Sequence, residues 1–513
     1  MGKLAAKAMA EDPRVAEAKR LLRETLRDHQ AALTGIRPAD PDLRQGYAET
    51  LARFGALRGA SLYYPYLGSG MGRGALVELA DGSVKYDFIT GIGVHYMGHN
   101  HPALLDAGVD AALENTVMQG NLQQNAWSEE LLGLMLKAAN RDGAGKDKGA
   151  GTGNSGGTKK GANLAHGFLT SSGAMANENA LKIIFQKKFP AHRVLAFEHC
   201  FAGRTIALSQ VTDKAAYRQG VPETLAVDYV PFYDATRPAE STAEAVAAIQ
   251  GHMARHPGAH ACMIFELIQG EGGGYLPGTP EFFRALMVPL RAAGVAILAD
   301  EIQTFGRTSE FFAFQHFGLD EFVDVVTLGK LSQACATLIR EEYKPKAGLV
   351  SQTFTAPSVA IRSALVILKY MEAEGFLGAD GKIMRLSRCF IGKLRDLAQR
   401  RPDLAAGPFG MGGMIAFTPL GGDPDWTATY LKNLFAAGVI GFIAGGKPAK
   451  ARFLLPVGGV EESDIEAVFP ILERVLIETA VAMKNAAAAK SIDAADTVGA
   501  AKNTGGAAKK GGS

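Results

Sequence analysis

The chain has 513 residues, 47% of them hydrophobic and 21% charged, so it can bury a large core and form two domains or more. Its formal net charge of +2 argues against a dedicated nucleic-acid-binding or membrane-surface protein, since these usually carry a basic excess. The four cysteines show neither paired nor metal-ligand spacing, and we recognise no signal-peptide or membrane-spanning pattern, so we expect a protein of the reducing cytoplasm.

In chain order, a helix is predicted over residues 15–33 and a hairpin over residues 76–88, turning at Asp81 and Gly82. Helices and short apolar strands then alternate: helices over 102–114, 128–139, 174–188 and 279–293, strands over 167–170, 194–197, 261–267, 295–299 and 324–328. A helix over 359–373, a further helix, strands near 413–417 and 452–455, and a last helix over 463–483 follow. This order predicts an α/β fold with a large, mostly parallel sheet flanked by helices, plus a smaller α+β domain.

We expect residues 89–345 to form the large domain and residues 346–484 the small one, which the amino-terminal segment 1–88 joins. Two segments are poor in apolar residues: a Gly- and Lys-rich insert over 142–163 and an Ala-, Lys- and Gly-rich tail over 485–513. Neither can bury enough apolar surface to offset its ordering entropy, so both are predicted to be disordered. A solvated loop and tail are favoured over binding sites for acidic partners.

Two charged residues follow apolar runs of the predicted sheet. Asp300 ends the run that begins at Val295, and Lys330 follows the run that begins at Val325. Because open α/β sheets bind ligands at the carboxyl ends of their strands, we expect both side chains to face one crevice. A lysine can form an imine with an aldehyde cofactor, and a carboxylate can keep a pyridine nitrogen protonated. The pair therefore predicts a pyridoxal 5'-phosphate site, although an exposed lysine and a capping acid are the simpler readings of each residue alone.

A second motif follows the predicted strand at 167–170 and opens a helix. It contains Ser172, Gly173 and Ala174. A hydroxyl at the cap, a glycine for close backbone approach and unsatisfied helix N–H groups together form an anion site, which suits a cofactor phosphate. A simple capped helix start is the alternative, and it is the more common one when such a motif stands alone.

In order and spacing, these segments resemble the class III pyridoxal-phosphate aminotransferases, which include ornithine, acetylornithine, 4-aminobutyrate and lysine 6-aminotransferases. The resemblance covers roughly residues 60–480, and it is carried by residues 86–102, 172–174, 201–205, 266–273 and 300–308, Lys330 and Arg452. It implies a fold type I transferase that binds pyridoxal 5'-phosphate.

The resemblance also implies roles for the residues around the cofactor ring. Lys330 is expected to bind the cofactor covalently and then to move the proton between substrate and cofactor carbons. Asp300 is expected to pair with the pyridine nitrogen, Gln303 to bond the ring hydroxyl, and Phe201 to stack on the ring face.

Further roles concern the phosphate and the neighbouring subunit. Ser172, Gly173 and Ala174 match the positions that hold the phosphate. Thr353 matches a hydroxyl that the family supplies from the other subunit, which implies a homodimer with shared active sites.

Two arginines are expected to govern substrate choice. Arg204 matches the position that grips a substrate carboxylate, for which a planar guanidinium is suited. Glu271 and Arg452 match a pair in which the acid shields the arginine from the amino donor and releases it to 2-oxoglutarate. Tyr63 is expected to touch the carboxylate of the amino donor.

The resemblance thus implies transfer of a distal (ω) amino group from lysine, ornithine or 4-aminobutyrate to 2-oxoglutarate. Acetylornithine transamination, aminomutation and decarboxylating transamination remain alternatives within the family. A non-catalytic scaffold that binds partners through the insert and tail is a contrasting hypothesis, which the intact Lys330, Asp300 and Gln303 disfavour. His99 and His101 lack an acid or cysteine at ligand spacing, so we predict a structural turn and no metal.

Overall fold

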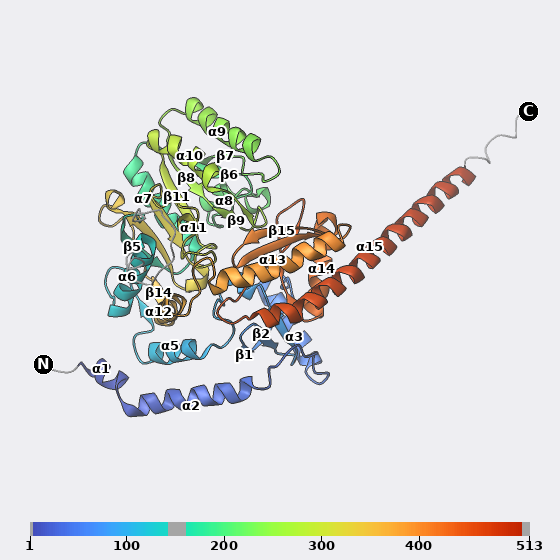
Figure 1. The fold of residues 1–513 in the computed structure, drawn as a ribbon, viewed down its shortest axis with the longest axis horizontal. Coiled ribbons are helices and arrows are strands. Elements are labelled where there is room, and N and C mark those ends of the chain that lie inside the picture. The colour runs from blue at the N-terminus through green and yellow to red at the C-terminus, as the bar shows by residue number, and fades with distance from the viewer. Residues whose placement is uncertain (1–3, 142–160, 505–513) are drawn as a thin grey trace, which may run out of the picture.

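A computed structural model of the protein describes residues 4–141 and 161–504, with side chains as far as residue 489. Figure 1 shows a large sheet wrapped by helices, a smaller α+β region beside it, and one long helix, α15, that projects away from both. Residues 142–160 of the insert predicted over 142–163, and the last nine residues of the chain, lie outside the described part. Residues 161–163 correct that prediction: Ala162 is buried, and its carbonyl accepts a hydrogen bond from Arg340.

The large sheet has seven strands in the order β5-β13-β12-β11-β8-β6-β7. Their bounds are β5 Leu164–Thr170, β6 Arg193–Phe197, β7 Ala226–Val230, β8 His260–Phe265, β11 Ala296–Glu301, β12 Val325–Leu328 and β13 Cys335–Arg340. The inner strands β8, β11 and β12 run parallel and are buried along their whole length. Continuous apolar runs are typical of such doubly covered strands, which confirms the predicted mostly parallel sheet.

Two strands of this sheet were not predicted. β7 pairs in parallel with β6, whereas β13 runs antiparallel to both β12 and β5. β13 ends at Arg340, whose buried guanidinium donates to the carbonyls of Ala162 and Glu321, at 3.0 Å and 2.8 Å. Arg340 is also ion-paired with Asp324 at 3.5 Å. A charged residue at the end of a buried strand makes the strand hard to recognise, because the groups that compensate the charge come from distant parts of the chain.

Helices cover the large sheet and extend along its edge. They are α5 Pro102–Ala112, α6 Ala126–Asn140, α7 Gly173–Lys188, α9 Pro238–Arg255, α10 Pro280–Ala292 and α12 Ser358–Ala373. Several begin as their sequences direct: Thr279 caps α10 through the Phe282 N–H at 3.2 Å, and Pro280 takes the first helical position. Short elements α4 Thr90–Gly93, α8 Leu208–Val211, α11 Ala313–His316, β4 Val117–Met118, β9 Ile268–Gln269, β10 Leu276–Pro277 and β14 Ala356–Pro357 complete this region.

The smaller region combines both ends of the chain. One sheet joins β1 Gly68–Arg73, β2 Leu76–Leu79 and β3 Val84–Asp87 to β17 Val439–Ile440, and a second joins β15 Ala405–Met411, β16 Met414–Pro419, β19 Lys450–Leu454 and β18 Phe442–Ala444. The predicted hairpin turn is present, with Gly82 at a φ of 77° that glycine adopts without strain. β3 pairs in parallel with β17, so the amino-terminal hairpin shares a sheet with the carboxyl-terminal part; the domain boundaries themselves stay predictions.

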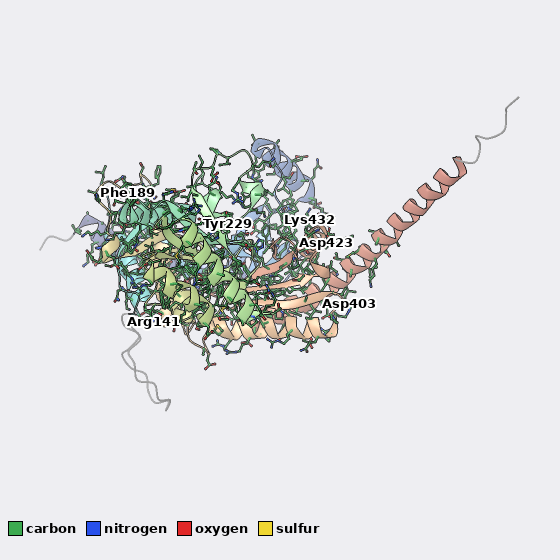
Figure 2. All side chains as sticks on the ribbon, turned by 90° about the horizontal axis from the view of Figure 1, so that it is seen from above. Arg141, Phe189, Tyr229, Asp403, Asp423 and Lys432 are labelled. Atoms are coloured by element: carbon green, nitrogen blue, oxygen red, sulfur yellow. The ribbon has the colours of Figure 1, made fainter. Side chains whose placement is uncertain are left out.

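The remaining helices are α1 Ala5–Ala10, α2 Pro13–Gln30, α3 Arg44–Arg58, α13 Lys382–Arg400, α14 Pro424–Ala436 and α15 Glu462–Thr504. α15 corrects one expectation: residues 485–504, predicted to be disordered, continue this helix, which extends beyond the folded body in Figures 1 and 2. The segment is rich in alanine, the residue with the highest helix propensity, so the helix can continue without burying an apolar face. In the part of the chain that is described, no helix combines the length and apolarity needed to cross a membrane.

Candidate active site

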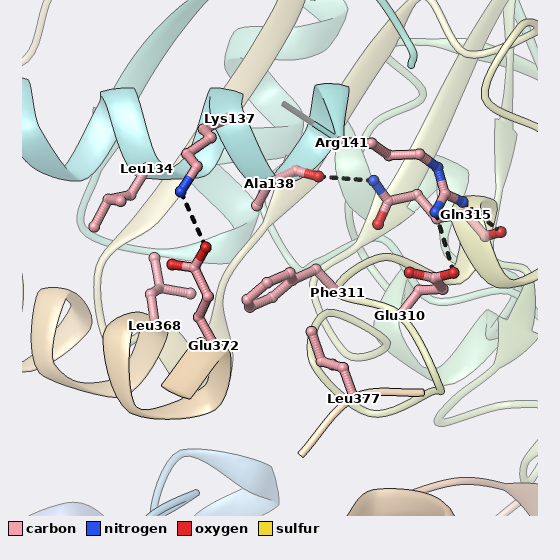
Figure 3. Close-up of a pocket in the computed structure, with 10 residues that line it drawn as sticks. All are labelled: Leu134, Lys137, Ala138, Arg141, Glu310, Phe311, Gln315, Leu368, Glu372 and Leu377. Carbon is pink, nitrogen blue, oxygen red and sulfur yellow. Dashed lines mark hydrogen bonds and ion pairs between the residues drawn. The ribbon is translucent and has the colours of Figure 1, made fainter. Parts of the chain in front are cut away.

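A cavity of about 330 Å³ opens where the carboxyl ends of β8, β11 and β12 meet the start of α7. This is the edge at which parallel α/β sheets bind ligands. Of the twelve site residues predicted from the sequence, eight line it: Gly173, Ala174, Phe201, Arg204, Glu271, Asp300, Gln303 and Lys330. The separate cavity in Figure 3, of about 260 Å³ between α6 and α12, contains none of the twelve.

Asp300 lies at the end of β11 in a fixed orientation. One carboxylate oxygen accepts a hydrogen bond from Asn177 Nδ2 at 2.8 Å, and the other accepts from the Ile302 N–H at 3.0 Å. Burial raises the pKa of Asp300 to about 6, against the opposing effect of these donors. At neutral pH the group is therefore an ionised acceptor at the base of the cavity.

Lys330 follows β12 after Gly329 and faces the same cavity. Its backbone has a φ of 54°, in the left-handed region that a lysine rarely adopts and that often marks functional sites. Desolvation lowers the pKa of its ammonium to about 8, although Glu271 and Asp300 act in the opposite direction. A larger share of the amine is thus neutral at pH 7 than in an exposed lysine.

The start of α7 forms one end of the cavity. Ser172 is the cap residue and accepts the Met175 N–H at 3.2 Å, and the helix begins at Gly173. A Cβ on Gly173 would lie 2.8 Å from the Ile302 side chain, so a larger residue would close the space. Free N–H groups and the helix dipole at this end favour an anion.

Phe201 and Gln303 lie on opposite loops around the cavity. The Phe201 N–H donates to Glu266 Oε2 at 2.7 Å, which fixes the loop that carries the ring. Gln303 Oε1 is buried and has no hydrogen-bond partner in the described protein. Because a buried polar atom without a partner is costly, this oxygen is suited to meet a ligand donor.

Arg452 on β19 does not line the cavity, but it pairs with Glu271, which does. Its side chain is completely buried, and Nη2 donates to Glu271 Oε2 at 2.7 Å, while Nε and Nη1 have no partner in the described residues. Burial opposes the charge, but Tyr275 and Glu271 raise the pKa of the guanidinium. A carboxylate ligand that displaced Glu271 would meet a guanidinium already free to bond at two further nitrogens.

Two other residues predicted to bind substrate, Arg204 and Tyr63, and one predicted to bind the cofactor, Thr353, are placed differently. Arg204 is exposed at the rim, with its guanidinium 4.5 Å from the centre of the Tyr217 ring. Tyr63 lies outside the cavity, although its ring packs against Phe442 at 4.8 Å, and Arg452 lies 5.4 Å from that same ring. Thr353 is exposed on the loop before β14 and does not line the cavity of its own chain.

Comparison with known proteins identifies the family. The profile of the Aminotransferase class-III family matches residues 66–476. The chain belongs to the class III aminotransferases. It is therefore an enzyme whose cofactor is pyridoxal 5'-phosphate, and not the non-catalytic scaffold weighed above.

Individual relatives agree with this assignment. Acetylornithine aminotransferase of Methanocaldococcus jannaschii is 26% identical over 423 residues, which cover 79% of this chain and 92% of that protein. Lysine aminotransferase from M. tuberculosis has a TM-score of 0.71 at 23% identity, covering 84% and 99% of the two chains. Ornithine aminotransferase from Toxoplasma gondii ME49 has a TM-score of 0.67 at 22% identity, covering 82% and 92%. These two structures establish the fold alone, that of the pyridoxal-phosphate-dependent aminotransferases.

The cavity of this aminotransferase fits its cofactor. An ionised, buried Asp300 suits a pyridinium N–H, the unpartnered Gln303 Oε1 suits a ring hydroxyl, and the start of α7 suits a phosphate. Lys330 supplies an amine with a lowered pKa in the same space. The donor set therefore matches the chemical groups of pyridoxal phosphate.

Sequence reasoning missed two residues that hold this arrangement in the aminotransferase. Asn177 donates to Asp300 Oδ2 and to the carbonyl of Ala202, both at 2.8 Å, so it joins β11 to the loop that carries Phe201. Glu266 accepts from the N–H groups of Phe201 and Gly270, at 2.7 Å and 3.2 Å. The sequence did contain a signal for Asn177: it lies one helical turn after Gly173, so it is on the same face of α7 as the predicted phosphate site.

Proposed function

We propose that this aminotransferase moves a distal amino group from a substrate such as lysine, ornithine, N-acetylornithine or 4-aminobutyrate to 2-oxoglutarate. The observation that carries the proposal is the ion pair between Glu271 and the buried Arg452. While Glu271 masks Arg452, the cavity accepts a donor that has no carboxylate next to its reacting ω-amine. When Glu271 releases Arg452, the same cavity accepts an α-keto acid, whose carboxylate Arg452 binds.

The roles of the lining residues follow from their chemistry. When bound, pyridoxal phosphate supplies an aldehyde for amine exchange and a ring that stabilises negative charge on the substrate carbon. The Asp300 carboxylate would accept a hydrogen bond from the N–H of the ring and so keep that nitrogen protonated. Lys330 Nζ, neutral in part at pH 7, takes the proton from the substrate carbon and returns it on the cofactor side. Arg452 and Arg204 bind substrate carboxylates, and Ser172, Gly173 and Ala174 hold the phosphate.

We further propose that the enzyme is a homodimer with Thr353 reaching the partner's active site. The loops around residues 119–125 and 351–355 lie together, linked by Gly120 N–H to the carbonyl of Gln352 at 3.2 Å. They expose Leu122 at 89% and Phe354 at 65%, an apolar surface that suits a second copy. Sedimentation of the wild type and of a Phe354→Asp variant tests this: the wild type should sediment as a dimer and the variant as a monomer.

The proposed reaction is tested by incubating the purified holoenzyme with 2-oxoglutarate and each of lysine, ornithine, N-acetylornithine and 4-aminobutyrate. Glutamate should form with at least one donor, and the absorbance of the bound cofactor should shift on adding that donor alone. Failure to form glutamate from every donor, by a protein that still carries the cofactor, would refute the proposed substrate class but not the family.

A further inference from the structure

A second, larger cavity lies in the small region, outside the proposed active site. It has a volume of about 840 Å³ and opens between the segment before α3, the β2–β3 hairpin and α14. Its walls include Arg44, Tyr47, Tyr63, Lys85 and Phe435, together with Lys432, which Figure 2 labels. It shares no lining residue with the cavity that contains Lys330.

Lys85 on β3 is the unusual residue of this cavity. It is only 7% exposed, and its ammonium lies 4.8 Å from the centre of the Phe435 ring. No hydrogen bond or ion pair from this ammonium to another group is recorded among the described residues. Desolvation lowers the pKa of Lys85, and the nearby Asp81 carboxylate opposes that effect only in part. Asp81 already accepts two hydrogen bonds from Ser83, one from its N–H at 2.9 Å and one from its hydroxyl at 2.6 Å.

The Lys85 side chain is largely buried, but it lines the cavity, and its ammonium, which lies over the Phe435 ring, keeps an unused capacity for an anion. Buried charges in proteins are normally paired or hydrogen-bonded, because an unpaired one loses its hydration without compensation. The cation–π contact with Phe435 offsets part of that loss. The three donors of the ammonium remain available on the cavity side.

Two further cations of the wall lack a carboxylate partner within the described chain. Arg44 donates only to the carbonyl of Ala39, at 3.4 Å, and the Lys432 ammonium lies 5.9 Å from the Tyr63 ring centre. Arg37 is committed, since it is ion-paired with Glu78 and bonds the Gly82 carbonyl at 2.8 Å. The wall therefore presents Lys85, Arg44 and Lys432 against one lining carboxylate, Asp81, and this excess of positive charge attracts an anion.

The same wall is rich in aromatic rings. The Tyr64 and Phe435 rings stack with centres 4.7 Å apart and planes 6° apart, and Tyr47 and Tyr63 line the neighbouring surface. Flat apolar walls with a few convergent polar groups are typical of small-molecule sites, and the volume is within their usual range. Inorganic anions would use the cations alone and leave the rings without contacts.

We propose that this cavity binds an organic anion in which a flat, unsaturated body carries a phosphate or a carboxylate, with the anionic group at Lys85 and the body against the aromatic wall. A phosphate and a carboxylate both fit the same cations, so the two kinds of ligand are tested with separate probes. The two cavities share no lining residue, so binding here does not require the residues around Lys330; Tyr63, predicted to touch the amino donor, lies in the wall of this second cavity.

The test uses the holoenzyme, in which the cofactor phosphate already occupies its own site, and isothermal titration with phenyl phosphate and with benzoate. Inorganic phosphate and benzyl alcohol are the comparison ligands, since each lacks one half of the proposed ligand. Lys85→Met removes the charge and retains the apolar stem, and Lys187→Met removes the same charge from the exposed end of α7. Phenyl phosphate or benzoate should bind at one site per chain, and the better of the two defines the anionic group.

Binding should weaken at least tenfold in Lys85→Met and less than twofold in Lys187→Met, and transaminase activity without added ligand should be equal in both variants. Lys432→Met should weaken binding severalfold and provides the second variant should Lys85→Met fold poorly. Absence of saturable binding by both aromatic anions would overturn the proposal. Equal affinity in the wild type, Lys85→Met and Lys432→Met would place the ligand elsewhere and overturn it too.

Discussion

Replacement of Glu271 by glutamine is the sharpest test of the proposed carboxylate switch. The substitution keeps the shape of the side chain but replaces the ion pair with Arg452, whose hydrogen bond is 2.7 Å long, by a hydrogen bond in which only the guanidinium is charged. Losing one of the two charges weakens the contact by about 1–1.5 kcal/mol, on the order of the difference between hydrogen bonds with and without a charged partner, so residue 271 is displaced more easily. That difference corresponds to roughly a tenfold gain for a carboxylate that competes for Arg452.

The assay follows each half-reaction separately by the absorbance of the bound cofactor. In Glu271→Gln, kcat/KM for 2-oxoglutarate should rise about tenfold relative to that for the ω-amino donor. Glu310→Gln is the matched control, because Glu310 forms a comparable ion pair with Arg141 at 3.1 Å in the separate cavity of Figure 3. The reasoning is refuted if the ratio of the two rate constants is the same, within twofold, in the wild type and both variants.

Further predictions concern the cofactor residues. Lys330→Met should lower kcat by about 10²–10⁴-fold, the usual contribution of a positioned acid–base group, with an unchanged circular dichroism spectrum. Asp300→Asn should reduce kcat by at least tenfold while pyridoxal phosphate still binds, as kinetics and absorbance can show together. Because the pKa of Lys330 is about 8, uptake of pyridoxal phosphate by the apoenzyme should accelerate as pH rises to about 8 and then level off. Glu301 is completely buried and accepts the N–H groups of Ala313 and Phe314, so Glu301→Gln should lower the free energy of unfolding by about 1–3 kcal/mol in denaturant titrations.

The sequence predicted the elements that carry the cofactor because their signals are local. Asp300 and Lys330 each end an apolar run, and both lie at the carboxyl edge of the sheet in the structure. Ser172 precedes a helix and caps it, as its hydroxyl and the following glycine indicated. Patterns of this kind need only the chain within a few residues of the site, so they can be read before the fold is known.

The parts that sequence reasoning missed depend on contacts between distant segments. Asn177 acquires its role from Asp300 and Ala202, which lie in other elements of the large region. β13 is recognisable only once β5 and β12 lie on either side of it. Tyr63 lies outside the cavity and packs against Tyr64 and Phe442, and the Phe442 ring in turn lies 5.4 Å from Arg452, so a role for Tyr63 depends on contacts that its local sequence does not show.

The position of Tyr63 bears on how donors are distinguished. Its ring packs against Phe442, the guanidinium of Arg452 lies 5.4 Å from the centre of the Phe442 ring, and the Lys432 ammonium lies 5.9 Å from the centre of the Tyr63 ring. A donor long enough to pass Arg452 would meet this aromatic pair, whereas a short donor would end at the arginine. Tyr63→Ala should therefore reduce kcat/KM for long donors such as N-acetylornithine more than for 4-aminobutyrate, because only the former extend far enough to lose contact area. Equal losses for both donors would show that Tyr63 supports the fold of the cavity wall and does not touch the substrate.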